Sequence, residues 1–153
     1  MYNCKNQITR VLQQIDDEVR KHIDEVIVVD NGSTDGGREV VLNYIEANNK
    51  KGFIKLFKNK ENYNLCGSQK VAFSYAVKNN FDYFIILHGD DQGNIHDLIP
   101  YLKSGEYKQY DRFLGSRFMK ESKIQGYSKF RTFGNKVYNI IFSIFLGKKL
   151  YDL

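Results

Sequence analysis

Two short segments of this chain combine the pattern of a buried strand with side chains that carry oxygen atoms. Residues 26–37 read VIVVDNGSTDGG, and residues 84–94 read FIILHGDDQGN. In each segment a run of apolar residues ends abruptly in carboxylates, amides and glycine, as when a buried parallel strand delivers polar groups to the carboxyl edge of a sheet. Ligands of open α/β sheets bind at that edge. The two segments therefore suit a nucleotide and a hard divalent cation, and they indicate an enzyme that works on an activated phosphate ester.

The first segment places hydrogen-bonding groups at the end of its strand. Asp30 could accept hydrogen bonds from a base or a ribose, while Asn31, Gly32 and Ser33 form a tight turn with exposed backbone amides. The same residue types also occur in an ordinary turn from a strand to a helix with an N-terminal cap. The second segment, with its own carboxylates, favours the ligand site over that alternative.

The second segment predicts a metal site. Mg²⁺ and Mn²⁺ take oxygen ligands and are usually held by one or two carboxylates together with substrate phosphates, which makes Asp90, followed by Gln92, the first choice of ligand. His88 could ligate Mn²⁺ through a neutral imidazole or could hydrogen-bond the nucleotide. Asp91 could contact sugar hydroxyls or supply a further metal ligand. Alternatively, both aspartates shape a turn and cap the helix expected near Asp97.

Basic residues further along the chain are candidates for phosphate binding. Lys70 lies near the start of a predicted helix, where it could reach a phosphate at the amino end, and an exposed surface lysine is an equal alternative. Arg117 ends another predicted strand, and Arg131 and Lys136 lie in a basic, aromatic segment. Arginine binds phosphate in a bidentate manner that lysine cannot reproduce. A solvated basic face is the alternative for these three residues.

Alternation of strand and helix patterns predicts the elements that must position these residues. Helical spacing of apolar residues is found in Asn6–His22, in the segment containing Val40, Val41, Tyr44 and Ile45, in Ser68–Lys78, in Asp97–Lys103 and in the later part of 126–146. Strands are predicted at Val26–Val29, Ile54–Phe57, Tyr83–Leu87, which would be central, and Arg112–Gly115. The order predicts an α/β sandwich on a mainly parallel sheet, in one domain over residues 1–153.

Composition bounds the possible partners and the compartment. The chain has 23 basic and 18 acidic residues, a net charge of +5, which fits nucleotide phosphates, prenyl phosphates or acidic lipid headgroups; a nucleic-acid partner is not expected. Two cysteines without a CxxC spacing give no support for a zinc site or a disulfide framework, so a cytoplasmic location is expected. The longest apolar stretch, Val137–Leu146, is too short for the roughly 20 residues of a membrane-spanning helix.

At this point the chain resembles a known family. The order of its motifs is similar to that of family 2 glycosyltransferases of the GT-A fold, in the branch of dolichol-phosphate mannosyltransferase and bacterial polyprenyl-phosphate glycosyltransferases. The motifs that carry the resemblance are Tyr2-Asn3, VVDNGSTDG, Asn62-x-Asn64-x-x-Gly67, HGDDQ, Gly115-Ser116-Arg117 and Arg131 with Asn139. They extend over nearly the whole chain.

The resemblance implies a fold, an activity and residue roles. The fold is a three-layer α/β/α sandwich, incomplete here, and the activity is inverting transfer of a hexose from a nucleotide diphosphate sugar to an acceptor such as a polyprenyl phosphate. Nucleotide-binding residues would be Tyr2, Asn3, Asp30, Asn31, Ser33 and Lys70; metal ligands for Mg²⁺ or Mn²⁺ would be Asp90, Gln92 and His88; catalytic residues would be Asp90, Asp91, Arg117 and Arg131; acceptor-phosphate residues would be Arg117, Arg131 and Lys136. A polyprenyl acceptor implies peripheral contact with the inner face of a membrane, for which Tyr127, Phe130, Phe133, Phe142 and Phe145 are candidates, with core packing as the alternative.

Departures from the family pattern keep a second function class open. His88 stands where relatives carry the first aspartate of an Asp-x-Asp-x-Gln motif, and Asn135-Lys136 stands where relatives often carry a serine-arginine pair. The first strand is expected to be missing or reduced to a stub, and the segment after Leu150 to be shortened. A non-catalytic nucleotide-binding or assembly module is therefore the alternative to a transferase. A nucleotidyltransferase is a weaker third hypothesis, because the glycine-rich opening of that group is absent.

Overall fold

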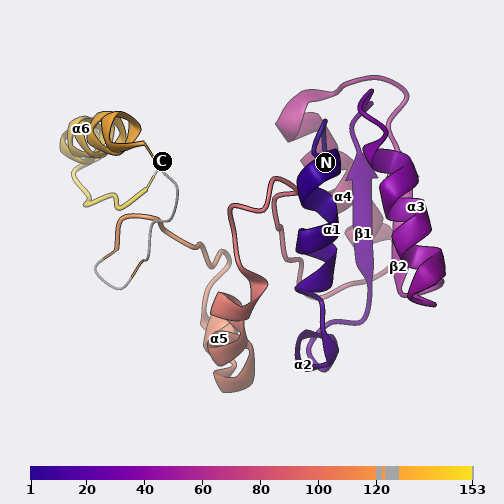
Figure 1. The fold of residues 1–153 in the computed structure, drawn as a ribbon. Helices are drawn as coiled ribbons and strands as arrows, with labels where there is room; N and C mark the ends of the chain where they lie inside the picture. The colour runs from indigo at the N-terminus through magenta and orange to yellow at the C-terminus, as the bar shows by residue number, and fades with distance from the viewer. Residues whose placement is uncertain (120–121, 123–127, 153) are drawn as a thin grey trace. The chain divides into compact units, whose positions relative to one another are not determined.

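The structure is a computed structural model that describes residues 1–119, 122 and 128–152. The chain divides into two compact units, Met1–Glu106 and Tyr107–Leu153, and each is described by itself. The expectation of a single domain stays a prediction. Figure 1 shows the order of the elements along the chain.

The first unit is built on a pair of parallel strands. β1 (Val26–Asp30) pairs with β2 (Ile54–Lys58) in parallel, with Val26 opposite Ile54 and Asp30 opposite Lys58. Met1 continues the pairing on the other edge of β1, since its amine donates to Val29 O (2.5 Å) and its carbonyl accepts from Asn31 N (2.9 Å), the hydrogen-bond pattern of a parallel bridge. These contacts agree with the expected α/β class.

Helices pack against this small sheet and against one another. α1 (Lys5–Gln13) packs on α3 (Gly37–Ala47), and α4 (Asn64–Lys78) contacts β1 (Figure 1). The core consists of twelve buried residues: Cys4, Ile8, Val11, Leu12, Ile15, Val19, Val28, Val41, Ile45, Ile54, Ile95 and Ile99. The period of 3.6 residues predicted for α1 and α3 is confirmed, because the apolar residues at that spacing face this core.

The predicted helix over Asn6–His22 is interrupted. α1 ends at Gln13, and the short α2 (Asp17–Arg20) follows. Asp16 caps α2, since its carboxylate accepts from Glu18 N and Val19 N at 3.0 Å each. An aspartate that binds free amides in this way favours the start of a new helix over continuation of the preceding one.

Two predicted strands are wrong. Tyr83–Leu87 and Arg112–Gly115 form no strand, and Tyr83, Ile86 and Leu114 are exposed. A strand is defined by a ladder of hydrogen bonds with a neighbour, and neither segment has one in the part of the chain that the structure describes. Within those residues the sheet has two strands, so the three-layer sandwich stays a prediction.

Boundaries of the later helices differ modestly from the prediction. α4 begins at Asn64, four residues before the predicted Ser68, so residues 64–67 also belong to the helix. The helix predicted at Asp97–Lys103 is a 3₁₀ helix, η1 (Ile95–Leu98), followed by α5 (Ile99–Ser104) with proline in its first turn, where the missing N–H has no helical partner to lose. A second 3₁₀ helix, η2 (Glu106–Gln109), follows.

The second unit contains α6 (Lys129–Leu146), as the aromatic segment predicts. The helix ends at Gly147, whose φ of 60° lies in the left-handed region that suits glycine. The chain then turns back along the helix. Asn139 Nδ2 donates to Tyr151 O (2.8 Å), and Leu150 N donates to Ser143 Oγ (2.8 Å).

Candidate functional site

The DNGSTDG turn, residues 30–36, follows β1 and contains a buried carboxylate that is half satisfied. Asp30 is fully buried, and its Oδ1 accepts from Ser33 N at 3.0 Å. Asp30 Oδ2 has no hydrogen-bond partner among the described residues. A buried carboxylate oxygen without a donor is costly, and polar groups left unpaired in this way mark sites that a ligand can complete. Asp30 therefore has an acceptor available for a base or a ribose.

Asn31 holds the neighbouring loop instead of facing solvent. Its Oδ1 accepts from Asn59 Nδ2 (2.9 Å) and Tyr63 N (2.8 Å), while its Nδ2 donates to Asn62 Oδ1 (2.7 Å) and Asn64 O (3.3 Å). A carboxamide offers two donors and two acceptor sites, so these four bonds use all of them. The side chain is buried. Asn31, predicted to bind the nucleotide, thus connects the DNGSTDG turn to residues 59–64 and has no hydrogen-bonding capacity left for a ligand.

Asn3 and Ser33, both predicted to bind the nucleotide, lie together. Asn3 N donates to Ser33 Oγ (3.2 Å), and Asn3 Oδ1 accepts from Thr34 N (2.9 Å). Tyr2, next to this pair in the chain, is 52% exposed and has room to meet a ligand. Lys70 is exposed in the second turn of α4 and not at its amino end, because the helix begins earlier than predicted.

The Asp35 carboxylate accepts hydrogen bonds from the first amides of two helices. Its Oδ2 accepts from Lys5 N (2.8 Å), the first residue of α1, and its Oδ1 accepts from Gly37 N (2.9 Å), the first residue of α3. These bonds, that from Lys5 N above all, lower the pKa of Asp35 from its ordinary value. Gly36 is the N-cap residue of α3, and Asp35, one residue before it, binds the amide of Gly37.

The HGDDQ turn, residues 88–92, presents three of its predicted metal ligands at the surface. His88, Asp90 and Gln92 are all exposed, and Asp90 Oδ1 accepts one long bond from Gln92 N at 3.4 Å. No cluster of three or more His, Cys, Asp and Glu side chains that could hold a metal ion is found among the described residues. Asp90 and Gln92 therefore fit a cation that substrate phosphates help to hold, not a cage built by protein side chains alone.

Asp91 has partners in the protein. Its Oδ2 accepts from Arg10 Nε (2.6 Å), and its Oδ1 accepts from Gln14 Nε2 (3.2 Å). Gln14 Nε2 also donates to Gly93 O (3.3 Å), and Gln14 Oε1 accepts from Ile95 N (2.9 Å). The structure thus assigns the Asp91 carboxylate to contacts with α1 and the residue after it, whereas the sequence offered it to the sugar or the metal.

Sequence reasoning missed Arg10, Gln14 and Asn59. On a helix with an apolar face, Arg10 and Gln14 look like ordinary solvated positions, and Asn59 follows a short strand without any motif. The pattern of polar residues gives no signal for such partners, because each depends on a residue between 28 and 81 positions away.

In the second unit, Arg117 is paired with an acid. Its Nη2 lies 2.5 Å from Asp152 Oδ1, and its Nε and backbone N both donate to Asp152 Oδ2 at 2.8 Å. The guanidinium thus presents its bidentate edge to a carboxylate, the geometry that it would use for a phosphate. Arg131 and Lys136 are exposed on α6. The acceptor-phosphate role of the three residues stays a prediction.

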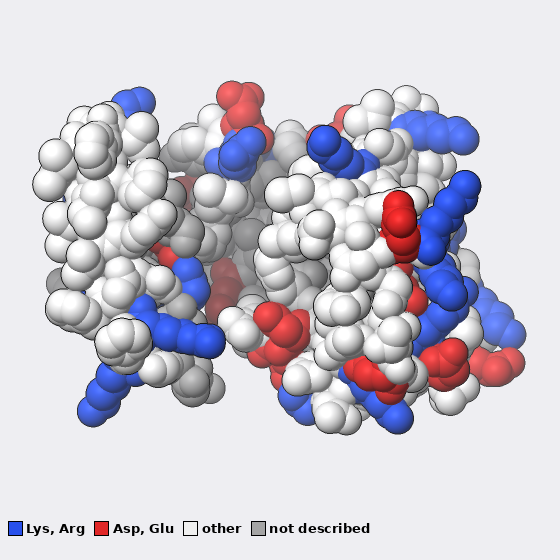
Figure 2. Space-filling view, turned by 90° about the horizontal axis from the view of Figure 1, so that it is seen from above, with Lys and Arg blue, Asp and Glu red and all other residues white. Residues whose placement is uncertain are grey.

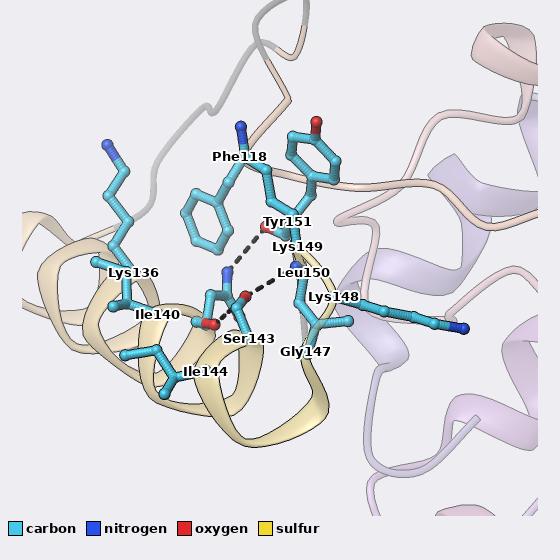
Figure 3. Close-up of a pocket in the computed structure, with 11 residues that line it drawn as sticks. Phe118, Lys136, Ile140, Ser143, Ile144, Gly147, Lys148, Lys149, Leu150 and Tyr151 are labelled. Carbon is cyan, nitrogen blue, oxygen red and sulfur yellow. Dashed lines mark hydrogen bonds between the residues drawn. The ribbon is translucent and has the colours of Figure 1, made fainter.

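A shallow pocket of about 570 Å³ lies between α6 and the segment that follows it. Its wall includes Phe118, Ile140 and Ile144, together with the hydrogen-bonded Asn139 and Ser143. In Figure 3 the side chains of Lys136 and Lys148 extend away from these hydrogen bonds. The polar groups in the pocket already satisfy one another, so the pocket is better explained by packing of the chain end on α6 than by a ligand.

The apolar residues of α6 are exposed. The hydrogen bonds of Asn139 and Ser143 turn the polar side of the helix towards the chain end, and no described residue of this unit covers the apolar residues on the remaining surface. Residues exposed by more than half are Phe130, Phe133, Tyr138, Ile140, Ile144, Phe145 and Leu146. Figure 2 shows this region as largely uncharged, with basic side chains at its margin. Phe142 is less exposed, and Tyr127 lies outside the described residues.

Among the described residues, no helix has the length and apolar character needed to cross a membrane. An amphipathic helix that lies along the surface of a bilayer needs only one apolar face. The exposed side of α6 is therefore a candidate for surface contact, and contact with the membrane stays a prediction.

Comparison with known proteins identifies the family of the chain. The family model described as glycosyl transferase family 2 matches residues 1–152. The chain belongs to this family, which supports a glycosyltransferase with an α/β fold of the GT-A type and with a nucleotide-sugar donor and an acceptor as substrates. No curated protein and no solved structure matches the chain.

Proposed function

We propose that the chain transfers a hexose from a nucleotide diphosphate sugar to the phosphate of a polyprenyl acceptor, within a three-layer GT-A sandwich. The unpaired Oδ2 of the buried Asp30 is the observation that carries the donor half of this proposal. It lies in the turn after β1, where open α/β sheets bind their ligands, and nucleotide N–H or O–H groups would complete it. The turn itself contains Ser33, Asn3 is hydrogen-bonded to it, Tyr2 is the neighbour of Asn3 in the chain, and Lys70 adds a positive charge to the same unit.

A divalent cation, Mg²⁺ or Mn²⁺, completes the donor site in this proposal. Asp90 would be its carboxylate ligand and Gln92 a neutral oxygen ligand, with His88 as a third group that favours Mn²⁺. When bound, such a cation neutralises charge on the leaving diphosphate. The exposure of these three side chains supports the assignment, because the substrate must supply the remaining ligands.

Inverting transfer to a phosphate does not require a strong general base from the protein. The acceptor phosphate is an anionic nucleophile at neutral pH, so its oxygen can attack the anomeric carbon as the bond to the nucleoside diphosphate breaks. Positioning of the two substrates and stabilisation of the leaving group then account for catalysis. Arg117, Arg131 and Lys136 are the groups proposed to hold phosphate, which requires Arg117 to exchange Asp152 for the ligand.

Membrane contact through α6 follows from the proposed acceptor. The exposed apolar residues would enter the headgroup region of the inner leaflet, with the cytoplasm as the compartment of the protein. Lys129, at the start of α6, would then face anionic lipid headgroups. Co-sedimentation with anionic but not with neutral vesicles, abolished by Ile144→Ser, is the expected result; equal binding of both vesicle types would contradict the electrostatic part.

A catalytically impaired nucleotide-binding or assembly module is the second candidate. The observation that favours it is the donor set of the HGDDQ turn, in which His88 stands where relatives carry the first aspartate. Such a module would bind the donor without transferring its sugar.

Calorimetric titration with a panel of nucleoside diphosphates and their sugars, with and without Mn²⁺, tests the proposal. We expect one base to be selected, with binding strengthened by Mn²⁺ in the wild type and not in Asp90→Ala. Asp91→Asn is the matched control, because Asp91 already has protein partners, and it should keep part of the metal effect. Absence of binding to every nucleotide would refute the donor site.

Product analysis then separates the candidates. Release of free nucleoside diphosphate with a polyprenyl phosphate acceptor supports transfer of the sugar, and the anomeric configuration of the product tests inversion. Pyrophosphate would indicate nucleotidyl transfer instead. Binding without turnover would favour the impaired module.

A further inference from the structure

Helix α1 contacts both turns of the candidate site. At its start, Lys5 N donates to Asp35 Oδ2 (2.8 Å), and Asn3, two residues earlier, is hydrogen-bonded to Ser33 and Thr34. The beginning of the helix is therefore fixed to the DNGSTDG turn. Lys5 N is the first amide of α1 and has no partner within the helix, so the turn satisfies it.

The segment 89–95 runs along α1 in the same direction. Near the start of the helix, Gly89 is so close that a Cβ atom at this position would lie 3.2 Å from Cys4 Sγ and 3.5 Å from Ile8 Cδ1. One turn further on, Asp91 is bound by Arg10 and Gln14. Beyond the helix, Gln14 also accepts from Ile95 N and donates to Gly93 O. The contacts advance along both segments together, which defines a register between them.

Gln14 makes these contacts from a shielded position. Its side chain is half-buried, and it accepts one bond and donates two, both from Nε2. The backbone partners Ile95 N and Gly93 O also fix the positions of the oxygen and the nitrogen in the Gln14 carboxamide, because an N–H group can only donate and a carbonyl oxygen can only accept. Gln14 is thus tied to the segment after the HGDDQ turn at two backbone positions.

Asp91 has a backbone conformation that suits this role. Its φ of 64° lies in the left-handed region, which aspartate and asparagine tolerate better than most residues. The conformation turns the chain so that the two carboxylate oxygens meet Arg10 and Gln14, while the neighbouring Asp90 and Gln92 remain exposed. Asp91 is therefore fixed by hydrogen bonds to the protein, while Asp90 and Gln92 remain accessible to a ligand.

We propose that α1 is a positioning element that holds the HGDDQ turn at a fixed place relative to the DNGSTDG turn, with Arg10 and Gln14 as positioning residues. The inference rests on the proposed function for its ligand, a nucleoside diphosphate with a divalent cation, and on the contacts above for its geometry. The nucleoside would meet the first turn and the cation the second, so their mutual strengthening depends on the fixed separation. Asp91 acts through Arg10 and Gln14 and does not touch the substrate.

Gln14→Leu tests the proposal on the full chain, with Gln13→Leu as a matched control. Gln13 is the preceding residue, is exposed, and receives the same substitution. Without any ligand, hydrogen exchange should become about fivefold faster or more at the amide of Ile95 and in residues 88–95 of Gln14→Leu, as expected when one hydrogen bond is lost. Gln13→Leu should exchange like the wild type.

A second readout separates positioning from general stability. In the wild type we expect Mn²⁺ to strengthen binding of the selected nucleoside diphosphate; Gln14→Leu should reduce this strengthening about tenfold and leave metal-free affinity within about twofold, on the scale of one hydrogen bond to a charged group. Asp91→Gly, which keeps the left-handed conformation, should act like Gln14→Leu, and Asp91→Asn should act more weakly.

Three results would overturn the inference. These are unchanged exchange in residues 88–95 of Gln14→Leu, equal loss of metal-free and metal-dependent affinity, and an effect of Gln13→Leu as large as that of Gln14→Leu. If the wild type binds no nucleoside diphosphate, the proposed function fails, and the exchange measurement still decides whether α1 holds the turn.

Discussion

Asn31→Asp is the substitution that most directly tests the network around the DNGSTDG turn. It exchanges one NH₂ group for an oxygen and leaves the size of the side chain almost unchanged. In the wild type that NH₂ group donates to Asn62 Oδ1 (2.7 Å) and Asn64 O (3.3 Å), both acceptors. The orientation of the amide is fixed, because Tyr63 N donates to Asn31 Oδ1 and the carbonyl of Asn64 can only accept.

The magnitude follows from these bonds. Two hydrogen bonds of about 1 kcal/mol each are lost, and the new carboxylate oxygen, buried beside two acceptor oxygens, adds about 1 kcal/mol or more, which gives a loss of about 3 kcal/mol in the free energy of unfolding at pH 7. That loss is a large part of the roughly 5–15 kcal/mol of a typical domain. The side chain is only 6% exposed, so water offers little compensation.

The effect of Asn31→Asp should depend on pH with a defined sign. Burial beside two acceptors disfavours the charged carboxylate, so its pKa rises in the folded state. The destabilisation is therefore complete above that raised pKa and shrinks as the pH falls towards about 4, the ordinary pKa of aspartic acid, over about two pH units for 3 kcal/mol. Protonation also restores one donor.

Urea unfolding followed by circular dichroism, at pH 7 and at pH 4.5, measures the effect. Asn49→Asp is the matched control, because Asn49 is exposed and also has a left-handed φ, of 51°. The control should stay within about 0.5 kcal/mol of the wild type, as surface substitutions do. If Asn31→Asp also stayed within that range at pH 7, the network would not stabilise the turn and the reasoning would be refuted.

Three further predictions concern the first unit. Ile8→Ala should lower the free energy of unfolding by about 3 kcal/mol, since Ile8 is 3% exposed in the core; a loss below 1 kcal/mol in urea unfolding would contradict this packing. Hydrogen bonds with Lys103, the largest cause, and with Lys21 lower the pKa of Glu18 from 4.5 to about 2, so the ionised Glu18 stabilises the protein above pH 4.5 and this effect is lost as the pH falls towards 2. Melting temperatures of the wild type and Glu18→Gln should therefore differ at pH 6 and converge near pH 2. A constant difference would exclude this ionic origin. Iodoacetamide should modify the exposed Cys66 in the native protein and Cys4 only after unfolding, because Cys4 is buried and burial raises the pKa of its thiol; equal rates, read by mass spectrometry, would contradict the burial of Cys4.

Helices and the first strand pair could be predicted because their signals are local. The spacing of Ile8, Val11 and Leu12 defines one face of a helix whatever surrounds it, and Val26–Val29 followed by Asp30 marks a strand and its end. Tyr83–Leu87 has the same composition as a strand, yet pairing depends on a neighbour that composition does not specify. The predicted strand was therefore wrong where the prediction relied on a distant partner.

In the candidate site, too, local features could be predicted and distant partners could not. Asp30 and Asp90 could be predicted as available oxygen groups, since their position at the end of an apolar run is visible in the sequence. Asn31 and Asp91 belong to the same motifs and have equally suitable side chains, but the structure gives both of them partners in the protein. Residue type and spacing cannot separate the two kinds, because hydrogen-bond partners are set by the folded chain.

The difference between residues that hold a turn and residues that are open to a ligand predicts different effects of substitution within one motif. Asn31 and Asp91 hold the turns, so changing them should alter stability or local exchange together with ligand binding. Asp30 Oδ2 has no donor among the described residues, and Asp90 is exposed, so replacing Asp90 should weaken metal-dependent binding with little change in stability. A loss of binding in variants of the DNGSTDG or HGDDQ turn therefore identifies a ligand contact only when unfolding and hydrogen exchange remain as in the wild type.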